Sequence, residues 1–260
     1  MCHPEVPVGA PVPDVERIEV EIPLVGRQER MPALMARPKT GAGAGVLVVC
    51  DVYGRSPFYE DLAGRLALAG FTALVPEYFF RQEPLAERTR ELAMARREQL
   101  DQNQTLVDLE QSIDWLKLQP FADGRVGTIG FCMGGTLVLD LAALRDDLAT
   151  VCFYGFPAGG DAVKGPPTPL TLTERMSGPI LGFWGDQDAG VGMENVEKLA
   201  SALRSRGADF EYRIHPGLGH GFMAQSQLDP AHEAYQAACE SWTRTVDFYR
   251  GHLASRPVTA

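Results

Sequence analysis

The chain has 260 residues, 45% of them hydrophobic and 22% charged, which is typical of a soluble globular protein with a sizeable core. Its formal net charge of -10 argues against a nucleic-acid partner and for small-molecule ligands, because phosphate binding requires clustered Lys and Arg. No run approaches the roughly 18 apolar residues of a membrane span, and no secretory signal is visible, so we expect a cytoplasmic protein without a membrane partner.

The N-terminal part predicts an arm followed by two strands. Residues 1–14 are rich in Pro and Val without a clear period, and we expect an extended arm in front of a single domain over residues 15–255. Apolar and charged residues alternate over residues 15–22, and a second short run covers residues 31–36 after a turn near Gly26. This period of two predicts an opening antiparallel pair of strands.

Beyond these strands, short apolar runs alternate with stretches of helical periodicity. The runs are typical of strands buried on both faces, and they cover residues 45–50, 71–75, 126–130, 150–154, 179–184 and 210–214. Apolar residues at spacings of three to four predict helices over residues 61–69, 85–118, 134–144, 196–205 and 231–253. The alternation predicts an α/β fold with a mainly parallel central sheet flanked by helices.

The segment Gly130-Phe131-Cys132-Met133-Gly134 lies between a predicted buried strand and a predicted helix. A G-x-C-x-G pattern in this place is typical of a nucleophile elbow, because small residues on either side let strand and helix approach closely. The N-terminus of the following helix also stabilises a thiolate. We therefore predict Cys132 as a nucleophile, with a buried structural cysteine as the alternative.

A thiolate that attacks a carbonyl needs a proton shuttle and an acid that orients it. In α/β-hydrolases these follow the nucleophile in the order acid, then histidine. Asp188 comes shortly after a predicted buried strand, and His220 lies in a glycine-flanked loop before the last helix. We predict this pair. Asp186 and His215 remain the alternatives, although Asp186 adjoins its strand closely and His215 ends its own strand.

No metal or cofactor site is indicated. The five cysteines are odd in number, widely spaced and free of any CxxC pair, which argues against a disulfide framework. Cys2 and His3 are adjacent rather than spaced like zinc ligands, and the remaining Cys and His are scattered. We expect reduced thiols, no metal and no cofactor.

Further motifs accompany the elbow along the chain. They are Met31-Pro32-Ala33-Leu34, Asp51-Val52-Tyr53-Gly54, Val75-Pro76-Glu77-Tyr78-Phe79-Phe80-Arg81, Gly185-Asp186-Gln187-Asp188 and Gly219-His220-Gly221-Phe222. In this combination the chain resembles the dienelactone hydrolases, also called carboxymethylenebutenolidases, over about residues 15–250. The resemblance implies a single α/β-hydrolase domain whose triad of Cys, Asp and His falls on Cys132, Asp188 and His220.

The resemblance further implies an oxyanion hole made by the backbone N–H groups of Val52 and Met133, which also suits the geometry of the fold. In the family, a Glu at the place of Asp51 bonds the resting thiol and helps to activate it. Asp is one methylene shorter, so activation by Asp51 is an open expectation. The alternative is a loop acid that caps the following turn.

The resemblance also implies a small lactone whose carboxylate is held by two arginines. One of them matches Arg81, whereas the other would fall on Ala224. Because a bidentate arginine–carboxylate pair is strong and shape-specific, we expect neutral lactones or esters to be tolerated better than the family's anionic substrate. Arg81 as a surface arginine is the alternative. Tyr53 and Phe222 are candidates for an apolar pocket wall, with plain core aromatics as the alternative.

Taken together, these features predict a hydrolase, active as a monomer or homodimer, that cleaves a small ester or lactone through a Cys132 acyl-enzyme. A thioesterase or other acyl hydrolase on the same fold is one alternative. A non-catalytic protein that binds a small ligand is another, since a fold alone does not specify an activity.

Overall fold

The computed structural model describes residues 15–159, 165, 167–223 and 230–254. The expected arm over residues 1–14 lies outside the described residues. An 8-stranded sheet forms the centre, with the strand order β1-β2-β4-β3-β5-β6-β7-β8. Its strands are β1 (Val15–Pro23), β2 (Arg30–Pro38), β3 (Gly43–Val49), β4 (Thr72–Pro76), β5 (Ala122–Phe131), β6 (Leu148–Phe153), β7 (Ile180–Gly185) and β8 (Phe210–His215).

The pairing of the strands confirms the predicted fold class. β1 pairs antiparallel with β2, and β2 pairs antiparallel with β4. All other neighbours are parallel, from β4 through β3, β5, β6 and β7 to β8. The inner strands are almost wholly apolar because helices cover both of their faces.

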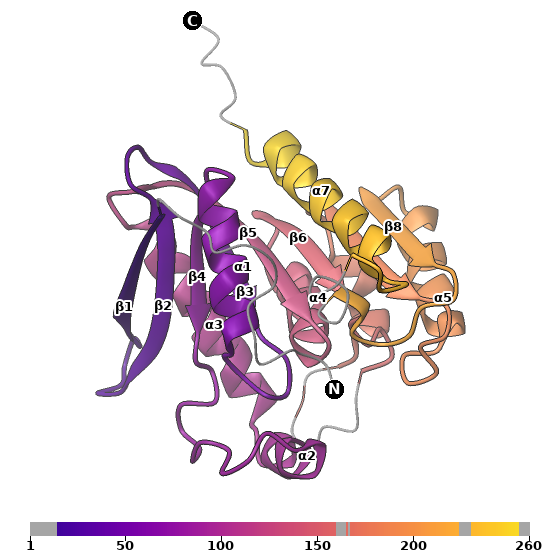
Figure 1. The fold of residues 1–260 in the computed structure, drawn as a ribbon, viewed down its shortest axis with the longest axis horizontal. Coiled ribbons are helices and arrows are strands. Elements are labelled where there is room, and N and C mark those ends of the chain that lie inside the picture. Colours follow the sequence, from indigo (N-terminus) through magenta and orange to yellow (C-terminus); the bar gives the residue numbers. More distant parts are fainter. Residues whose placement is uncertain (1–14, 160–164, 166, 224–229, 255–260) are drawn as a thin grey trace, which may run out of the picture.

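Helices form the outer layers of the molecule. Figure 1 shows α1 (Pro57–Leu68) and α7 (Tyr235–His252) on one face of the sheet and α3 (Gln102–Lys117), α4 (Met133–Leu144) and α5 (Met193–Ser205) on the other. The short α2 (Arg90–Glu98) lies beyond one edge of these layers (Figure 1). A 3-10 helix, Pro169–Arg175, precedes β7 and was not predicted.

The largest departure from the predicted elements is a break in the long helix expected over residues 85–118. Two helices, α2 and α3, occupy this stretch. The side chain of Thr89 accepts a hydrogen bond from the Leu92 N–H at the start of α2, and that of Asp101 accepts one from the Gln104 N–H at the start of α3. Such N-caps begin a helix, so the chain turns between them and places α2 against the carboxyl ends of the strands.

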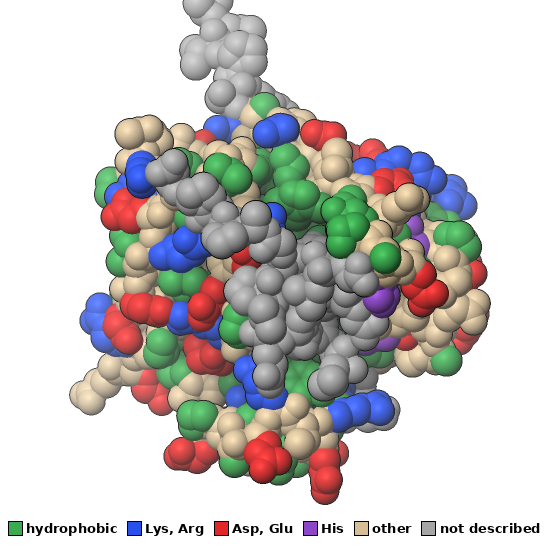
Figure 2. Space-filling view, viewed as in Figure 1, with side chains coloured by type: hydrophobic (Ala, Val, Ile, Leu, Met, Phe, Trp, Pro, Cys, Tyr) green, Lys and Arg blue, Asp and Glu red, His purple; other side chains and the backbone are tan. Residues whose placement is uncertain are grey.

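The distribution of charged side chains on the surface agrees with the net negative charge of the chain (Figure 2). On the face shown in Figure 2, acidic and basic side chains of the described residues are interspersed rather than gathered into a basic stripe. A nucleic-acid surface would require such a stripe. Among the described residues, every helix is too short or too polar to cross a membrane.

Candidate active site

Cys132 stands on a sharp turn between β5 and α4. Its backbone φ of 57° and ψ of -118° lie in a region that residues other than glycine rarely adopt. The flanking glycines make the turn possible: a Cβ at Gly130 would lie 2.1 Å from the Gly134 carbonyl oxygen, and one at Gly134 would lie 2.2 Å from that of Val49. The elbow pattern is therefore required by close backbone packing, and it holds the thiol at the N-terminus of α4.

Asp188 and His220 form a hydrogen-bonded pair on the loops that follow β7 and β8. His220 Nδ1 lies 2.6 Å from Asp188 Oδ2, and Asp188 is buried. The other carboxylate oxygen, Oδ1, accepts from the Val191 N–H at 3.2 Å, which fixes the plane of the carboxylate. With Nδ1 bonded to Asp188, Nε2 is the nitrogen of His220 that can exchange a proton with a thiol or a water.

The alternative acid and base take part in other contacts. Asp186 is exposed, and its Oδ1 accepts from the Gly217 N–H at 2.7 Å, so it closes a loop. His215 is buried against helix α7, where Nε2 lies 2.9 Å from Ser241 Oγ. Burial lowers the pKa of His215. Neither residue lines the cavity that contains Cys132, whereas Asp188 and His220 both do.

The loop after β3 is held by hydrogen bonds on both sides of Val52. The Tyr53 N–H donates to Asp51 Oδ1 at 2.8 Å, and Arg96 Nη2 donates to the Val52 carbonyl at 3.2 Å. The Asp51 carbonyl also accepts from the Gly54 N–H at 2.9 Å. Asp51 is buried and caps this turn, which is the structural role considered for it.

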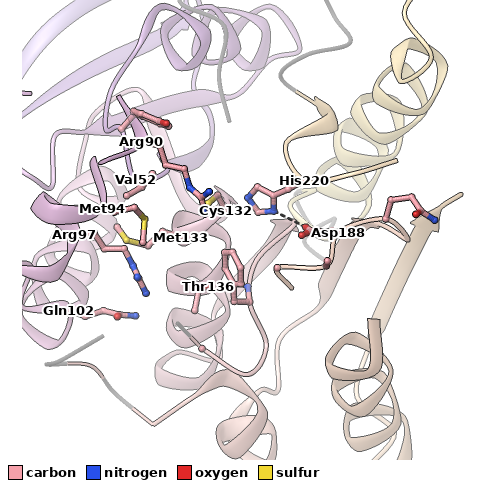
Figure 3. A pocket seen from close by; sticks show the side chains of 16 residues that line it. Val52, Arg90, Met94, Arg97, Gln102, Cys132, Met133, Thr136, Asp188 and His220 are labelled. Atoms are coloured by element: carbon pink, nitrogen blue, oxygen red, sulfur yellow. Dashed lines mark hydrogen bonds and ion pairs between the residues drawn. The ribbon is translucent and has the colours of Figure 1, made fainter. Parts of the chain in front are cut away.

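A cavity of about 840 Å³ connects these elements. Cys132, Asp188 and His220 line it together with the two expected oxyanion donors, Val52 and Met133, and with Tyr53. Figure 3 shows the dashed contact between His220 and Asp188 beside Cys132. The arrangement brings a thiol, an imidazole bonded to a carboxylate and two candidate backbone donors to one space.

The cavity also has a wall that the sequence did not predict. Arg90, Met94 and Arg97 on α2 line it, and so does Gln102 at the start of α3 (Figure 3). These residues fell inside the single long helix expected there. The helix-start pattern of Asp101 followed three residues later by Gln104 could have revealed the break.

Two of the expected substrate residues do not line this cavity. Arg81 donates from Nη1 to Asp108 and from Nε to Glu29, and its guanidinium lies 4.3 Å from the centre of the Phe80 ring. Asp108 is a buried partner that the sequence did not reveal. Phe222 is buried, with its ring 5.6 Å from that of Tyr154. Ala224, the expected place of a missing arginine, lies outside the described residues.

The remaining thiols have different surroundings. Burial raises the pKa of Cys50 well above its ordinary value and that of Cys152 to about 12. Cys239 is exposed, whereas Cys132 lines the cavity. No group of three or more His, Cys, Asp or Glu side chains within the described ranges could hold a metal ion.

Comparisons with known proteins agree with the geometry. A family model described as the dienelactone hydrolase family matches residues 31–253. A carboxymethylenebutenolidase from Rhodococcus opacus is 32% identical over 256 residues, which cover 97% of this chain and 98% of that protein.

Solved structures show the same similarity. A Klebsiella pneumoniae protein provisionally named a dienelactone hydrolase is 30% identical, with a TM-score of 0.81 over 93% of this chain and 99% of that one. A dienelactone hydrolase from Anabaena variabilis is 19% identical, with a TM-score of 0.66 over 92% of this chain and 99% of that one. At that lower identity the likeness concerns the fold alone.

Proposed function

Because the chain belongs to the dienelactone hydrolase family, we propose that it cleaves a carboxylic ester or lactone through a covalent bond to Cys132. The observation that carries the proposal is the meeting of Cys132 with the hydrogen-bonded pair of His220 and Asp188 in one cavity. Each of these groups has a definite task in acyl transfer, and their geometry suits those tasks.

The first half of the reaction forms an acyl-enzyme. His220 Nε2 takes the proton of the Cys132 thiol, and the thiolate attacks the carbonyl carbon of the substrate. The oxyanion that forms accepts hydrogen bonds from the backbone N–H groups of Val52 and Met133. The C–O bond of the ester then breaks, and the proton on His220 passes to the leaving alkoxide. In a lactone, this alkoxide stays attached to the acyl group.

The second half regenerates the thiol. A water molecule gives a proton to His220 and attacks the thioester carbonyl, and the same two N–H groups hold the new oxyanion. The C–S bond breaks, a carboxylic acid leaves, and the proton returns from His220 to sulfur. Asp188 holds the imidazole with Nε2 toward the reacting atoms and stabilises its positive charge.

Replacing the proposed nucleophile tests this function. We expect Cys132→Ala to reduce hydrolysis of aryl esters and small lactones by several orders of magnitude, because a covalent step is removed. The matched control is Cys239→Ala, which changes an exposed cysteine outside the cavity and should leave the rate unchanged. Mass spectrometry of the wild type during turnover of a slow ester should show an acyl group on the peptide containing Cys132. Cys132→Ala activity above about a tenth of wild type would contradict the proposal.

A further inference from the structure

The cavity carries two positive charges that the proposed chemistry does not use. Arg90 stands in the first turn of α2 and Arg97 in its last turn, and both line the cavity (Figure 3). Within the described ranges, neither guanidinium forms an ion pair with a carboxylate. Among the described residues, the acidic side chain that lines the cavity is that of Asp188, which is already bonded to His220. In a chain of net charge -10, such a wall favours an anionic ligand.

Gln102 marks the end of the cavity that is remote from Cys132. Its Nε2 donates to Asp140 Oδ2 at 3.4 Å. Asp140 follows Cys132 by eight residues, and seven of those steps lie within α4, which corresponds to roughly 10 Å along the helix axis. The Gln102 amide therefore lies about two helical turns from the nucleophile, and Figure 3 shows the Arg97 side chain extending toward it.

The groups at this end can accept a carboxylate. Arg97 offers guanidinium donors, and the Gln102 amide has a second N–H besides the one directed at Asp140. Burial raises the pKa of Asp140 to about 8, so this neighbouring carboxyl is mostly protonated at neutral pH and adds little negative charge behind Gln102.

We propose that Arg97 and Gln102 form an acid-binding subsite at the end of the cavity remote from Cys132. Its ligand is the terminal carboxylate of an elongated acyl group whose ester or lactone carbonyl lies at Cys132. A cavity of about 840 Å³ is large enough for such a substrate. The inference rests on the proposed function and adds a substrate class to it.

This subsite differs from the clamp expected from the sequence. That expectation considered positions 81 and 224 and predicted a preference for neutral substrates. Arg81 is held by Asp108 and Glu29, while α2 supplies other arginines to the cavity. The separation of Arg97 from Cys132 favours a carboxylate several bonds from the scissile carbonyl over one next to a compact lactone ring.

Matched aryl esters test the subsite. The 4-nitrophenyl monoesters of adipate and suberate are compared with the 4-nitrophenyl esters of hexanoate and octanoate, which have the same chain lengths without the second carboxylate. We expect the acid-to-neutral ratio of kcat/KM to exceed one for the longer pair and to rise from adipate to suberate. Arg97→Gln should lower this ratio about tenfold or more, since a charge-assisted hydrogen bond is lost.

A control variant separates a local effect from a general loss of positive charge. Arg204 occupies the last turn of α5, is exposed and does not line the cavity. Arg204→Gln should therefore keep the wild-type ratio. Gln102→Leu, which removes the amide donor without changing the charge, should lower the ratio less than Arg97→Gln. A wild-type ratio that does not change with chain length, or an unchanged ratio in Arg97→Gln, would overturn the subsite.

A binding measurement gives a result that does not depend on turnover. Titration calorimetry with free suberate should show binding to the wild type and to Arg204→Gln, and at least tenfold weaker binding to Arg97→Gln. If no ester is hydrolysed but suberate binding requires Arg97, the subsite stands and the proposed hydrolysis fails. If suberate binds the wild type and Arg97→Gln equally, or binds neither, the subsite is wrong.

Discussion

The cavity has two walls that are held in different ways. The strand-end wall consists of Cys132, Met133, Asp188 and His220, which lie at or in the loops after the ends of β5, β7 and β8. The α2 wall consists of Arg90, Met94 and Arg97. The elbow at Cys132 is tightly packed, since neither Gly130 nor Gly134 has room for a Cβ. The helix α2 is packed more loosely, since only one of its residues, Ala93, is buried.

The α2 wall rests on a small apolar cluster separate from the main core. This cluster contains Val52, Tyr53 and Ala93, with Leu85 and Met94 packed against it. A helix supported in this way can change its cavity-facing residues at little cost to the core. The comparison suggests that the proposed chemistry depends on the strand-end wall and that substrate choice depends on the α2 wall.

The largest expected effect concerns the acid of the strand-end wall. Asp188→Asn should reduce kcat by about 10⁴-fold, because the amide no longer holds His220 in the required tautomer or stabilises its charge. Asp186→Asn is the matched control two residues away. This substitution affects only the side chain that accepts a hydrogen bond from the Gly217 N–H, and it should change kcat by less than about threefold. Steady-state kinetics on both proteins decide the matter, and a reversed order of effects would reassign the acid to Asp186.

The packing of the elbow gives the second prediction. In Gly130→Ala, the new methyl group would meet the Gly134 carbonyl oxygen at 2.1 Å, so we expect a loss of more than about 3 kcal/mol in the free energy of unfolding. Gly251→Ala is the control, because nothing lies within 4 Å of its Cβ and it stands in α7. That variant should be more stable by about 0.5 kcal/mol. Urea unfolding measures both, and a Gly130→Ala protein of wild-type stability would refute the argument.

These two predictions concern features that the sequence reveals well. The apolar runs all occur as strands in the structure. Those that form inner strands are buried on both faces, whereas residues 210–214 form the edge strand β8, in which burial alternates. The role of Gly130 and Gly134 could be inferred from the sequence, because two backbones that approach this closely leave room only for glycine. The order of strands and loops then brought Cys132, Asp188 and His220 to one edge of the sheet.

The α2 wall could not be predicted in the same way. Apolar spacing continues from α2 into α3, so periodicity alone does not distinguish two helices from one. The surroundings of Arg81 could not be predicted either. The resemblance matched it to a carboxylate-binding arginine, whereas its guanidinium is bound by Asp108 from α3. Asp108 is 27 residues away from Arg81 in the sequence, and tertiary packing brings the two together, so no local pattern reveals the pair.

The third prediction concerns Asp140, which lies behind Gln102. Its folded-state pKa of about 8 is above the ordinary value of 3.8, so the folded protein binds more protons than the unfolded chain between these values. Stability therefore falls as the pH rises through this window. Asp140→Asn removes the dependence, and the stability that it adds should be about 3–4 kcal/mol greater at pH 8 than at pH 5.

Thermal or urea unfolding at the two pH values measures this difference. Asp146→Asn is the matched control, because Asp146 is exposed just beyond the same helix. It should give the same change in stability at both pH values. If Asp140→Asn destabilises the protein equally at pH 5 and pH 8, the carboxyl is needed for its contact with Gln102 and its protonation has no effect on folding.

The smallest expected effect concerns a contact between α2 and the loop after β3. Arg96 projects from α2, donates to the Val52 carbonyl at 3.2 Å and lies 4.0 Å from the centre of the Phe79 ring. The peptide that it holds directly follows the proposed oxyanion donor. Arg96→Met keeps the length of the side chain but removes the donor, and we expect kcat to fall about five- to tenfold, as for the loss of one hydrogen bond.

The way in which the loss divides between kcat and KM distinguishes positioning from substrate binding. If Arg96 orients the Val52 peptide, kcat falls while KM for a neutral ester changes little, because the oxyanion exists only in the transition state. Arg96→Lys, which can still donate to Val52, should recover part of kcat although it cannot stack on Phe79 as a planar guanidinium does. A rise in KM with unchanged kcat would instead assign Arg96 to substrate binding, and the Val52 peptide would then keep its position without this contact.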